Sequence, residues 1–419
     1  MTRNQRSPPE TSPRPGITGG HLLGTNLERA GDHNLRVTLQ AIRRRGAVTR
    51  TDLALMTGLT PAAITNITKR LLRDRLILEA GRTRGGLGQP ATKLTINLDG
   101  CYSLGLNIDR DHITLVVVDF SGRVRARSSR EIPFALPDAV RKFFGRSVDH
   151  LLAQARIDPD NVVGIGVAFP DDIQRAELPG QPPEYAVWGD TSVHELLSGT
   201  LPVPVFVEND AAAAAMGELQ FGLGLHYQNF FYILITAALG GGVVLDGHYA
   251  RGAVGRSGEV GWLHERGGTA EPRQLQKIVS LSGLYQSLAN GGIQVSSPHE
   301  LARLDPANEI LTQWIESAAT ALEDALVSIN CLLNPEAVLI GGRLPATLVD
   351  RLTARLNDRM QAYKNVVPSL APIVRAAMSD DASAVGAAIL PFSELFLPPT
   401  RYLSRRIAAQ TDYREREPL

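Results

Sequence analysis

Residues 49–76 read TRTDLALMTGLTPAAITNITKRLLRDRL, and this stretch decides the class of fold at the front of the chain. Thr49 and Thr60 are residue types that begin helices, and Pro61 suits the first position of a helix, where its missing N–H is not needed. Gly58 lies where a tight turn needs a residue without a Cβ. The stretch therefore predicts a short helix, a turn and a second helix.

The second of these helices is predicted to present a polar face to solvent. Ile64, Ile67 and Leu71 recur at helical spacing and predict its inward side. The opposite side carries small and polar side chains, which let a helix approach base edges in a major groove and hydrogen-bond with them. The DNA contacts predicted from this unit are Arg50, Thr60, Ala62, Ala63, Thr65, Asn66, Lys69 and Arg70. The alternative is an ordinary helical hairpin within a larger domain.

The distribution of charge favours the DNA-binding interpretation. Residues 1–95 contain 16 Lys and Arg against 6 Asp and Glu, whereas the remainder contains 27 against 37, so the formal net charge of zero conceals two oppositely charged parts. A basic domain attracts phosphates whatever the base sequence, and an acidic remainder is repelled by them. Arg43, Arg44 and Arg45 end a preceding helix, where phosphate contact and simple solvation are equally compatible with the pattern.

Two short strands are predicted after the second helix, at Leu76–Glu79 and Lys93–Asn97, joined by a glycine-rich cationic stretch. This order is typical of the wing of a winged helix-turn-helix, which we place at residues 26–98. From the wing, Arg82, Arg84 and Gln89 could enter a minor groove. A flexible basic loop without that role is the alternative.

Length and composition restrict the rest of the chain. A length of 419 residues suggests about three domains. The proline-rich start, residues 1–25, is predicted to be a disordered arm, and residues 397–419 a tail. Neither a signal peptide nor an apolar run of membrane-spanning length is present, so we expect a cytoplasmic protein with no membrane partner. Cys101 and Cys331 are the only cysteines, which argues against a disulfide framework and a thiolate metal site.

Beyond residue 100 the sequence predicts an α/β protein of two lobes, at residues 101–222 and 223–396, with the final helix able to return to the first lobe. Ligands of such folds bind at strand ends. The expected strands are Ser103–Ile108, His112–Asp119, Val162–Ala168, Val205–Glu208, Phe230–Thr236, Gly242–Leu245 and Ala337–Ile340, and the expected helices include Pro137–Ala155, Val193–Leu197 and Glu309–Leu333.

The order of motifs resembles the ROK family over roughly residues 30–392. The motifs are GIGVAFP at 164–170, VENDAAAAA at 207–215, ALGGGV at 238–243, GRSGEVG at 255–261, NPEAVLIGG at 334–342 and SDDASAVGAA at 379–388. The family joins sugar kinases to sugar-responsive repressors on one actin-like ATPase fold, and its repressors carry a winged helix-turn-helix. The resemblance implies a transcriptional regulator, a repressor, whose partners are a double-stranded DNA operator and a sugar or sugar derivative.

Departures from the family pattern argue against a kinase. The resemblance places the catalytic base at Asp210, which we interpret as vestigial. The first phosphate loop, D-x-G-G-T in the kinases, reads NIDRD at residues 107–111, so a metal-binding aspartate is replaced by Asn107. Asp109 and Asp111 are expected to repel a polyphosphate by on the order of 4 kcal/mol at around 4 Å and an effective dielectric of about 20. We expect no enzyme activity and no cofactor; a kinase with an attached DNA-binding domain is the alternative.

Sugar binding is better supported, because Asn209, Asp210 and Glu259 match family positions that hydrogen-bond sugar hydroxyls. Glu259 could instead cap nearby amides. Trp262 replaces a histidine that serves both sugar and zinc in the family, and it could stack on a sugar ring or fill the vacated space. Because the family's cysteine cluster is also missing, we expect no metal. Glycines 240–242, 341 and 342 are interpreted as serving turns and close packing rather than nucleotide binding.

The resemblance also implies assembly. A homodimer or homotetramer would align two winged helices on half-sites about 34 Å apart. Closure of the lobes on a ligand would then re-space the DNA-binding domains. The sequence leaves open whether the ligand releases or promotes DNA binding, and whether the effector is a protein partner instead of a sugar.

Overall fold

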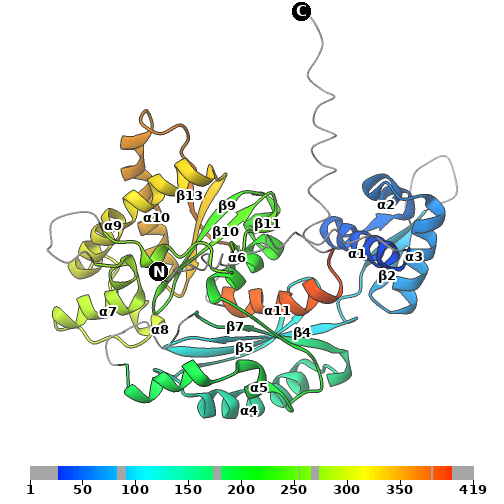
Figure 1. Ribbon diagram of the computed structural model, residues 1–419, viewed down its shortest axis with the longest axis horizontal. Helices are drawn as coiled ribbons and strands as arrows, with labels where there is room; N and C mark the ends of the chain where they lie inside the picture. The colour runs from blue at the N-terminus through cyan, green and yellow to red at the C-terminus, as the bar shows by residue number, and fades with distance from the viewer. Residues whose placement is uncertain are drawn as a thin grey trace, which may run out of the picture.

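The computed structural model describes residues 27–82, 91–171, 173, 181–253, 255–265, 273–378 and 381–398. The predicted α/β class is confirmed: two five-stranded sheets with helices follow a small helical domain that carries its own three-stranded sheet (Figure 1). The predicted N-terminal arm and most of the predicted tail lie outside the described residues, as do Arg84 and Gln89. None of the described helices is long and apolar enough to cross a membrane.

The N-terminal domain has the element order of a winged helix-turn-helix. Its helices are α1 (Leu27–Arg45), α2 (Arg50–Thr57) and α3 (Pro61–Arg73), and its strands are β1 (Val48–Thr49), β2 (Ile77–Arg82) and β3 (Thr92–Ile96). The strands form an antiparallel sheet in the order β1-β3-β2. Strand β1 was not predicted, because two residues give no periodicity.

Local interactions explain why this domain starts and stops its helices where it does. Thr49 accepts a hydrogen bond from the Asp52 amide, and the Asp52 side chain accepts one from the Thr49 amide, which forms a capping box at the start of α2. Gly58 ends α2 with a φ of 67°, a conformation that costs glycine little. Thr60 accepts from the Ala63 amide and starts α3.

The first lobe is built on a sheet in the order β6-β5-β4-β7-β8. The helices α4 (Pro137–Ala155) and α5 (Val193–Leu197) cover one face of this sheet and bury a common apolar core. Strand β6 was not predicted, since its sequence VRARSSRE is mostly polar and it lies at the sheet edge. The strands are β4 (Tyr102–Ile108), β5 (His112–Asp119), β6 (Val124–Glu131), β7 (Val162–Ala168) and β8 (Val205–Glu208).

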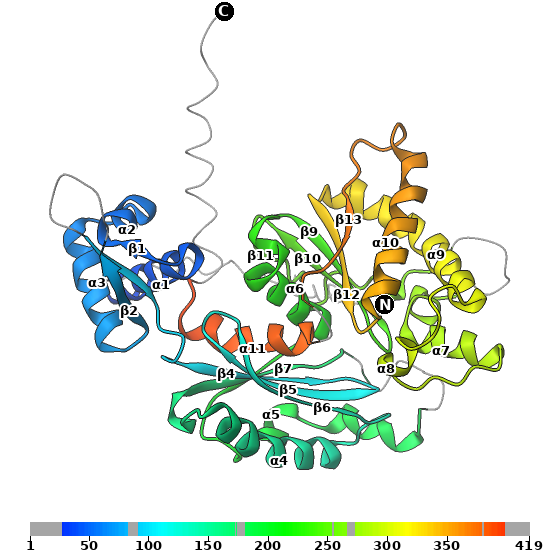
Figure 2. The same ribbon diagram turned by 180° about the vertical axis from the view of Figure 1, so that it is seen from behind.

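Two helices, α6 (Asp210–Phe221) and α11 (Ala382–Leu395), fill the space between the lobes (Figure 2). The last helix, α11, lies directly on the other face of the first sheet: a Cβ at Gly105 would meet the Ala384 carbonyl oxygen at 1.9 Å. In turn α11 packs on α6, where a Cβ at Gly386 would meet the Ala213 carbonyl oxygen at 1.8 Å. Small residues therefore bring these layers into backbone contact.

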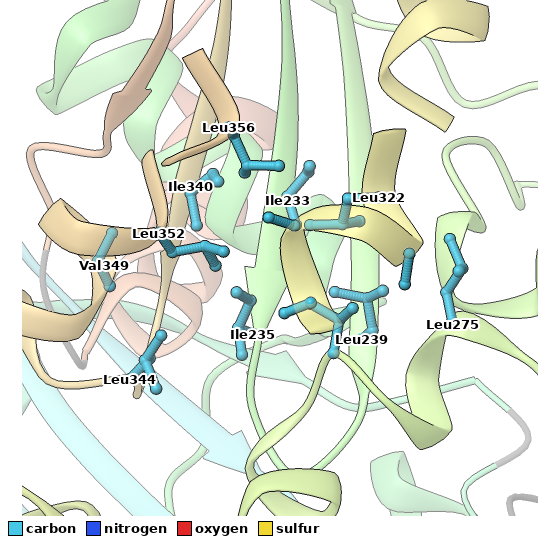
Figure 3. Close-up of a cluster of buried hydrophobic side chains, with 14 of the residues drawn as sticks. Ile233, Ile235, Leu239, Leu275, Leu322, Ile340, Leu344, Val349, Leu352 and Leu356 are labelled. Atoms are coloured by element: carbon cyan, nitrogen blue, oxygen red, sulfur yellow. The ribbon is translucent and has the colours of Figure 1, made fainter. Parts of the chain in front are cut away.

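The second lobe has a sheet in the order β11-β10-β9-β12-β13. Ile233, Ile235 and Ile340 of this sheet pack against Leu322 and Leu352 of the outer helices (Figure 3). The strands are β9 (Phe230–Ile235), β10 (Leu239–Leu245), β11 (His248–Tyr249), β12 (Ala337–Gly342) and β13 (Ile373–Arg375), and the helices are α7 (Leu281–Asn290), α8 (Pro298–Leu301), α9 (Glu309–Leu333) and α10 (Ala346–Met360).

Candidate functional site

The outer face of α3 presents several of the predicted DNA contacts. Ile64, Thr68 and Leu71 are buried, and the opposite side exposes Ala62, Asn66, Lys69 and Arg70, with Ala63 and Thr65 half-buried. Within the described residues, the side chains of Asn66 and Lys69 have neither a hydrogen-bond nor an ion-pair partner, which leaves their polar groups available to a ligand.

Arg50 and Arg70 are already engaged within the domain. Arg50 Nε donates to Thr68 Oγ1 at 3.0 Å, and its guanidinium lies 3.9 Å from Glu79. Arg70 lies 3.6 Å from Asp32. The role of Thr68 was not predicted, because a threonine on the inward side of a helix gives no signal of a long-range contact. Thr68 holds Arg50 against α3 at one edge of the exposed face.

The strands β2 and β3 pair antiparallel at the place of the predicted wing. Arg82 pairs with Thr92 at the far end of the hairpin; Arg82 is exposed and Thr92 is half-buried. The predicted contacts Arg84 and Gln89 belong to residues 83–90, which are not described, so their role stays a prediction.

Arg43 is not the solvated cation that was one interpretation of the run Arg43–Arg45, because its side chain packs against the body of the protein. Arg43 Nη2 donates to Gln220 Oε1, and its guanidinium carbon lies 5.3 Å from the centroid of the Phe221 ring. Phosphate contact by this run stays a prediction. Arg44 and Arg45, its neighbours, are exposed.

The start of α6 positions two of the predicted sugar contacts. Asn209 is the N-cap of α6, and its Oδ1 accepts from the amides of Ala211 at 2.9 Å and Ala212 at 3.1 Å. The cap interaction uses the oxygen and leaves the Asn209 amide group as a donor. Asp210 is 8% exposed; burial, reinforced by the charge of Asp109 and opposed by Arg110, raises the pKa of Asp210 to about 7.

Glu259 reaches the same pocket as Asn209. Arg256 Nε donates to Glu259 at 3.0 Å and lies 3.8 Å from Asp171, which follows β7 of the first lobe. Arg256 thus links the two lobes over the pocket, and Arg251 does the same beside it by pairing with Glu208 at 2.7 Å. Trp262 ends the short 3-10 helix η4 (Val260–Trp262), is 40% exposed and is not among the residues that line this pocket.

The segment that replaces the first phosphate loop forms a network of charged groups. Asp111 accepts from Arg343 Nη1 at 2.9 Å and contacts His112 Nδ1 at 2.7 Å, while Arg343 also donates to Glu131. Burial opposes ionisation of Asp111, but the charges of His112 and Arg343 lower its pKa. The negative charge expected at Asp111 is therefore compensated by Arg343, a cation of the second lobe. Arg343 was not predicted as part of this site. The one signal in the sequence is that Arg343 shortly follows a predicted strand, at whose end ligands of α/β folds bind.

Asp109, Asp111 and His112 place potential metal-ligand atoms within 4.8 Å of one another. Both His112 nitrogens are engaged, Nδ1 by Asp111 and Nε2 by the Asn107 amide at 3.0 Å. Arg110 and Arg343 are adjacent cations. This chemistry fits an ion-pair network better than a divalent cation.

The glycines that keep the kinase pattern serve close packing, as interpreted. Gly240 and Gly242 lie within β10, where an added Cβ would meet Ala211 Cβ at 2.8 Å and Ala215 Cβ at 2.7 Å. A Cβ at Gly341 would meet the Tyr232 hydroxyl at 2.0 Å. The first two glycines are needed for α6 to lie against β10.

Comparisons with known proteins agree with this architecture. The uncharacterized protein y4fQ of Sinorhizobium fredii (strain NBRC 101917 / NGR234) is 30% identical over 87% of this chain and 91% of its own length. The xylose repressor of Bacillus subtilis (strain 168) is 27% identical over 55% of this chain and 60% of its own length. A solved structure of a ROK family transcriptional regulator, a homolog of the E. coli MLC protein, aligns with a TM-score of 0.63 at 23% identity, covering 88% of this chain and 98% of that one.

The sequence profile of the ROK family matches residues 103–393, which include both lobes and the helices α6 and α11 between them. With this match, and with the relative that covers most of the chain, the resemblance inferred from the motifs is confirmed: the chain belongs to the ROK family.

Proposed function

We propose that this protein is a transcriptional regulator, a repressor, that binds an operator through α3 and the β2–β3 wing and responds to a sugar or sugar derivative bound at the start of α6. The observation that carries the proposal is the combination, in one chain, of an exposed polar recognition face on α3 and a polar pocket beside Asn209 and Glu259. The names of the relatives that are repressors support the same reading.

The DNA-binding part of the proposal rests on the chemistry of α3. An asparagine side chain can bond adenine bidentately, and small neighbours such as Ala62 allow the helix to enter the groove. Lys69 supplies a phosphate contact without sequence preference. The remaining predicted contacts, Arg50, Thr60, Ala63, Thr65, Arg70 and Arg82, surround these residues.

The effector part rests on the pocket. Carboxylates and amides are suited to hydroxyl-rich ligands, because each sugar hydroxyl both donates and accepts. The pocket between them has a volume of only about 20 Å³, so the proposal requires the lobes to open to admit a sugar. Asn209 offers donors, Glu259 offers acceptors, and Asp210 lies next to them at the first position of α6. Trp262 and Asp210 both lie outside the residues that line this pocket, and we propose them as contacts that a bound sugar would reach from the edge of the pocket.

We further propose that the protein transfers no phosphate. The segment that aligns with the kinase phosphate loop is joined to the second lobe by Arg343, which donates to Asp111 and to Glu131. These side chains bind one another where a kinase would bind phosphate. The proposed assembly is a dimer, or a pair of dimers, that aligns two recognition helices on an inverted repeat. A regulator of this kind acts in the cytoplasm, where its operator lies.

The experiment that tests this function is selection of binding sites from a random oligonucleotide pool, repeated with and without a mixture of pentoses, hexoses and N-acetylhexosamines. We expect an enriched inverted repeat whose half-sites are about 10 base pairs apart or a multiple of it, and enrichment that changes with sugar. Glu259→Ala should abolish the effect of sugar and keep the operator, whereas Glu316→Ala on the surface of α9 should change neither.

Absence of enrichment under both conditions would overturn the DNA-binding proposal. An enriched operator with no response to any sugar, in affinity or in melting temperature, would overturn the effector proposal and favour a protein partner as the signal.

A further inference from the structure

The helix α6 connects the candidate ligand site to the DNA-binding domain. Its N-cap and first residue are Asn209 and Asp210, and its last two residues, Gln220 and Phe221, contact Arg43 of α1. A helix of 12 residues is about 18 Å long, so one rigid element covers this distance.

The contact at the far end of α6 is specific. Arg43 Nη1 donates to the Gln220 carbonyl oxygen at 3.5 Å, and Nη2 donates to the Gln220 side chain. Arg43 Nε donates to Gln40 at 2.9 Å, which orients the guanidinium. The last carbonyls of a helix lack intrahelical partners and carry partial negative charge, so a cation is favoured at this position.

Arg43 has no alternative anionic partner among the described residues. It forms no ion pair with a carboxylate there, and burial, with the like charge of Arg44, lowers its pKa to about 10. The guanidinium nevertheless remains cationic at neutral pH. Its interactions are therefore directed at the end of α6 and at Gln40.

The middle of α6 is tightly packed on two sides. Residues 211–215 are all alanine, which lets neighbouring backbones approach closely. On one side Gly386 of α11 touches the Ala213 carbonyl, and on the other side Gly242 of β10 leaves no room for a Cβ beside Ala215. Interiors packed in this way transmit displacement rather than absorb it.

Open space lies on one side of the contact between α1 and α6. A cavity of about 560 Å³ adjoins the contact and is bounded by Ile42, Arg43, Leu78, Phe221 and Leu225. On the other side, Phe120, Phe392 and Phe396 pack with Leu39 and Ile42 in one apolar cluster, which forms a pivot for α1. A shift at the end of α6 can thus rotate α1 about this cluster into the cavity.

We propose that Arg43 is the positioning residue through which α6 transmits ligand occupancy at Asn209 and Asp210 to α1, and so to the recognition helix α3. The proposal rests on the proposed function. A ligand that binds one position of α6 more tightly than the other shifts the population of α1 orientations by that difference in affinity. By reciprocity, binding of the operator changes the affinity for the ligand by the same factor.

The test uses Arg43→Met, which keeps most of the packing of the stem and removes the guanidinium. The control is Arg45→Met, which removes the same charge from an exposed position of α1 that does not line the cavity. For each full-length variant, operator affinity is measured by fluorescence anisotropy with and without the sugar of the panel that most raises the wild-type melting temperature. Calorimetry without DNA gives the affinity for that sugar.

We expect the wild-type ratio of operator affinities with and without sugar, about fivefold or more for allosteric coupling, to fall below about twofold in Arg43→Met. Sugar affinity without DNA should stay within about twofold of wild type in both variants. Arg45→Met should keep the wild-type ratio even if its operator affinity is lower. If Arg43→Met fails to fold, Gln220→Ala removes the side-chain acceptor from the other partner and should lower the ratio in the same way.

Retention of the wild-type ratio in a folded Arg43→Met protein, or in Gln220→Ala where that variant replaces it, would overturn the proposal. This outcome is distinguishable from failure of the proposed function, in which the wild type itself shows no response to any sugar. Equal loss of the ratio in Arg45→Met would also overturn it, since charge alone would then explain the effect.

Discussion

Arg343 Nη1 lies 2.9 Å from Asp111 Oδ2, and this pair joins the two lobes at the place where the family's kinases have their first phosphate loop. Arg343 follows β12 in the second lobe, and Asp111 lies in the turn between β4 and β5 of the first. The Arg343 side chain is only 8% exposed and also binds Glu131. The charges once expected to repel a nucleotide are instead part of a connection between the lobes.

Replacing Arg343 by Met should destabilise the protein. The substitution leaves Asp111, whose side chain is 20% exposed, with His112 as its remaining partner, so the cost should lie below the roughly 3 kcal/mol of breaking a fully buried pair and above that of a surface pair. The midpoint of urea unfolding should fall accordingly. Arg355→Met is the matched control, because Arg355 pairs with Glu316 on the surface and such pairs contribute about 1 kcal/mol or less. Similar small shifts in both variants would show that the lobes do not depend on this pair.

A second prediction concerns catalysis. With Mg-ATP and the sugar panel, the wild-type protein should form no more ADP than Asp210→Asn, because the segment at Asp109 and Asp111 lacks the glycines and the metal-binding aspartate of the kinases. A coupled ADP assay measures this. Turnover that the Asp210→Asn substitution abolishes would establish the kinase alternative.

The elements that sequence could predict are those governed by local rules. The capping residues Thr49 and Thr60, the turn at Gly58 and the buried strands from Tyr102 onward follow from side-chain type and periodicity over a few residues. The edge strand β6 could not be predicted in this way, because an edge strand with a polar face lacks the apolar signal of a buried one.

The contacts that connect distant parts of the chain could not be predicted. Arg43 lies 177 residues from Gln220, and Arg343 lies 232 residues from Asp111. In a single sequence each arginine looks like any other surface cation, since its partner is chosen by the fold. Family motifs located Asn209 and Glu259, but they gave no sign of the bridge from Arg256 to Asp171.

On the DNA-binding face, Asn66→Ala and Lys69→Ala should weaken binding in different ways. Asn66 is predicted to read a base, so its loss should cost about 1–3 kcal/mol on the operator and little on random DNA. Lys69 is predicted to contact a phosphate, so its loss should weaken both and reduce the slope of log affinity against log salt by about 1. Titrations on both DNAs at several salt concentrations separate the two. Equal losses on operator and random DNA in Asn66→Ala would contradict its assignment to base reading.

The last prediction concerns pH. Burial, with the nearby charge of Asp109, raises the pKa of Asp210 to about 7 in the folded protein, against about 4 in the unfolded chain. Between about pH 4 and about pH 7, Asp210 keeps its proton in the folded state and has lost it in the unfolded state. The contribution of Asp210 to stability is therefore complete below about pH 4 and is lost as the pH rises to about 7.

Asp210→Asn should therefore be more stable than the wild type at pH 8, and the difference in their free energies of unfolding should be smaller at pH 5. The difference should change by about 1.4 kcal/mol per pH unit between the two pKa values. Urea unfolding of both proteins across this range gives the difference directly, and titrations common to both cancel. Asp138→Asn, on the exposed face of α4, should run parallel to the wild type. A difference between Asp210→Asn and wild type that does not change with pH would mean that Asp210 is ionised throughout, held so by Arg110 against the cost of burial.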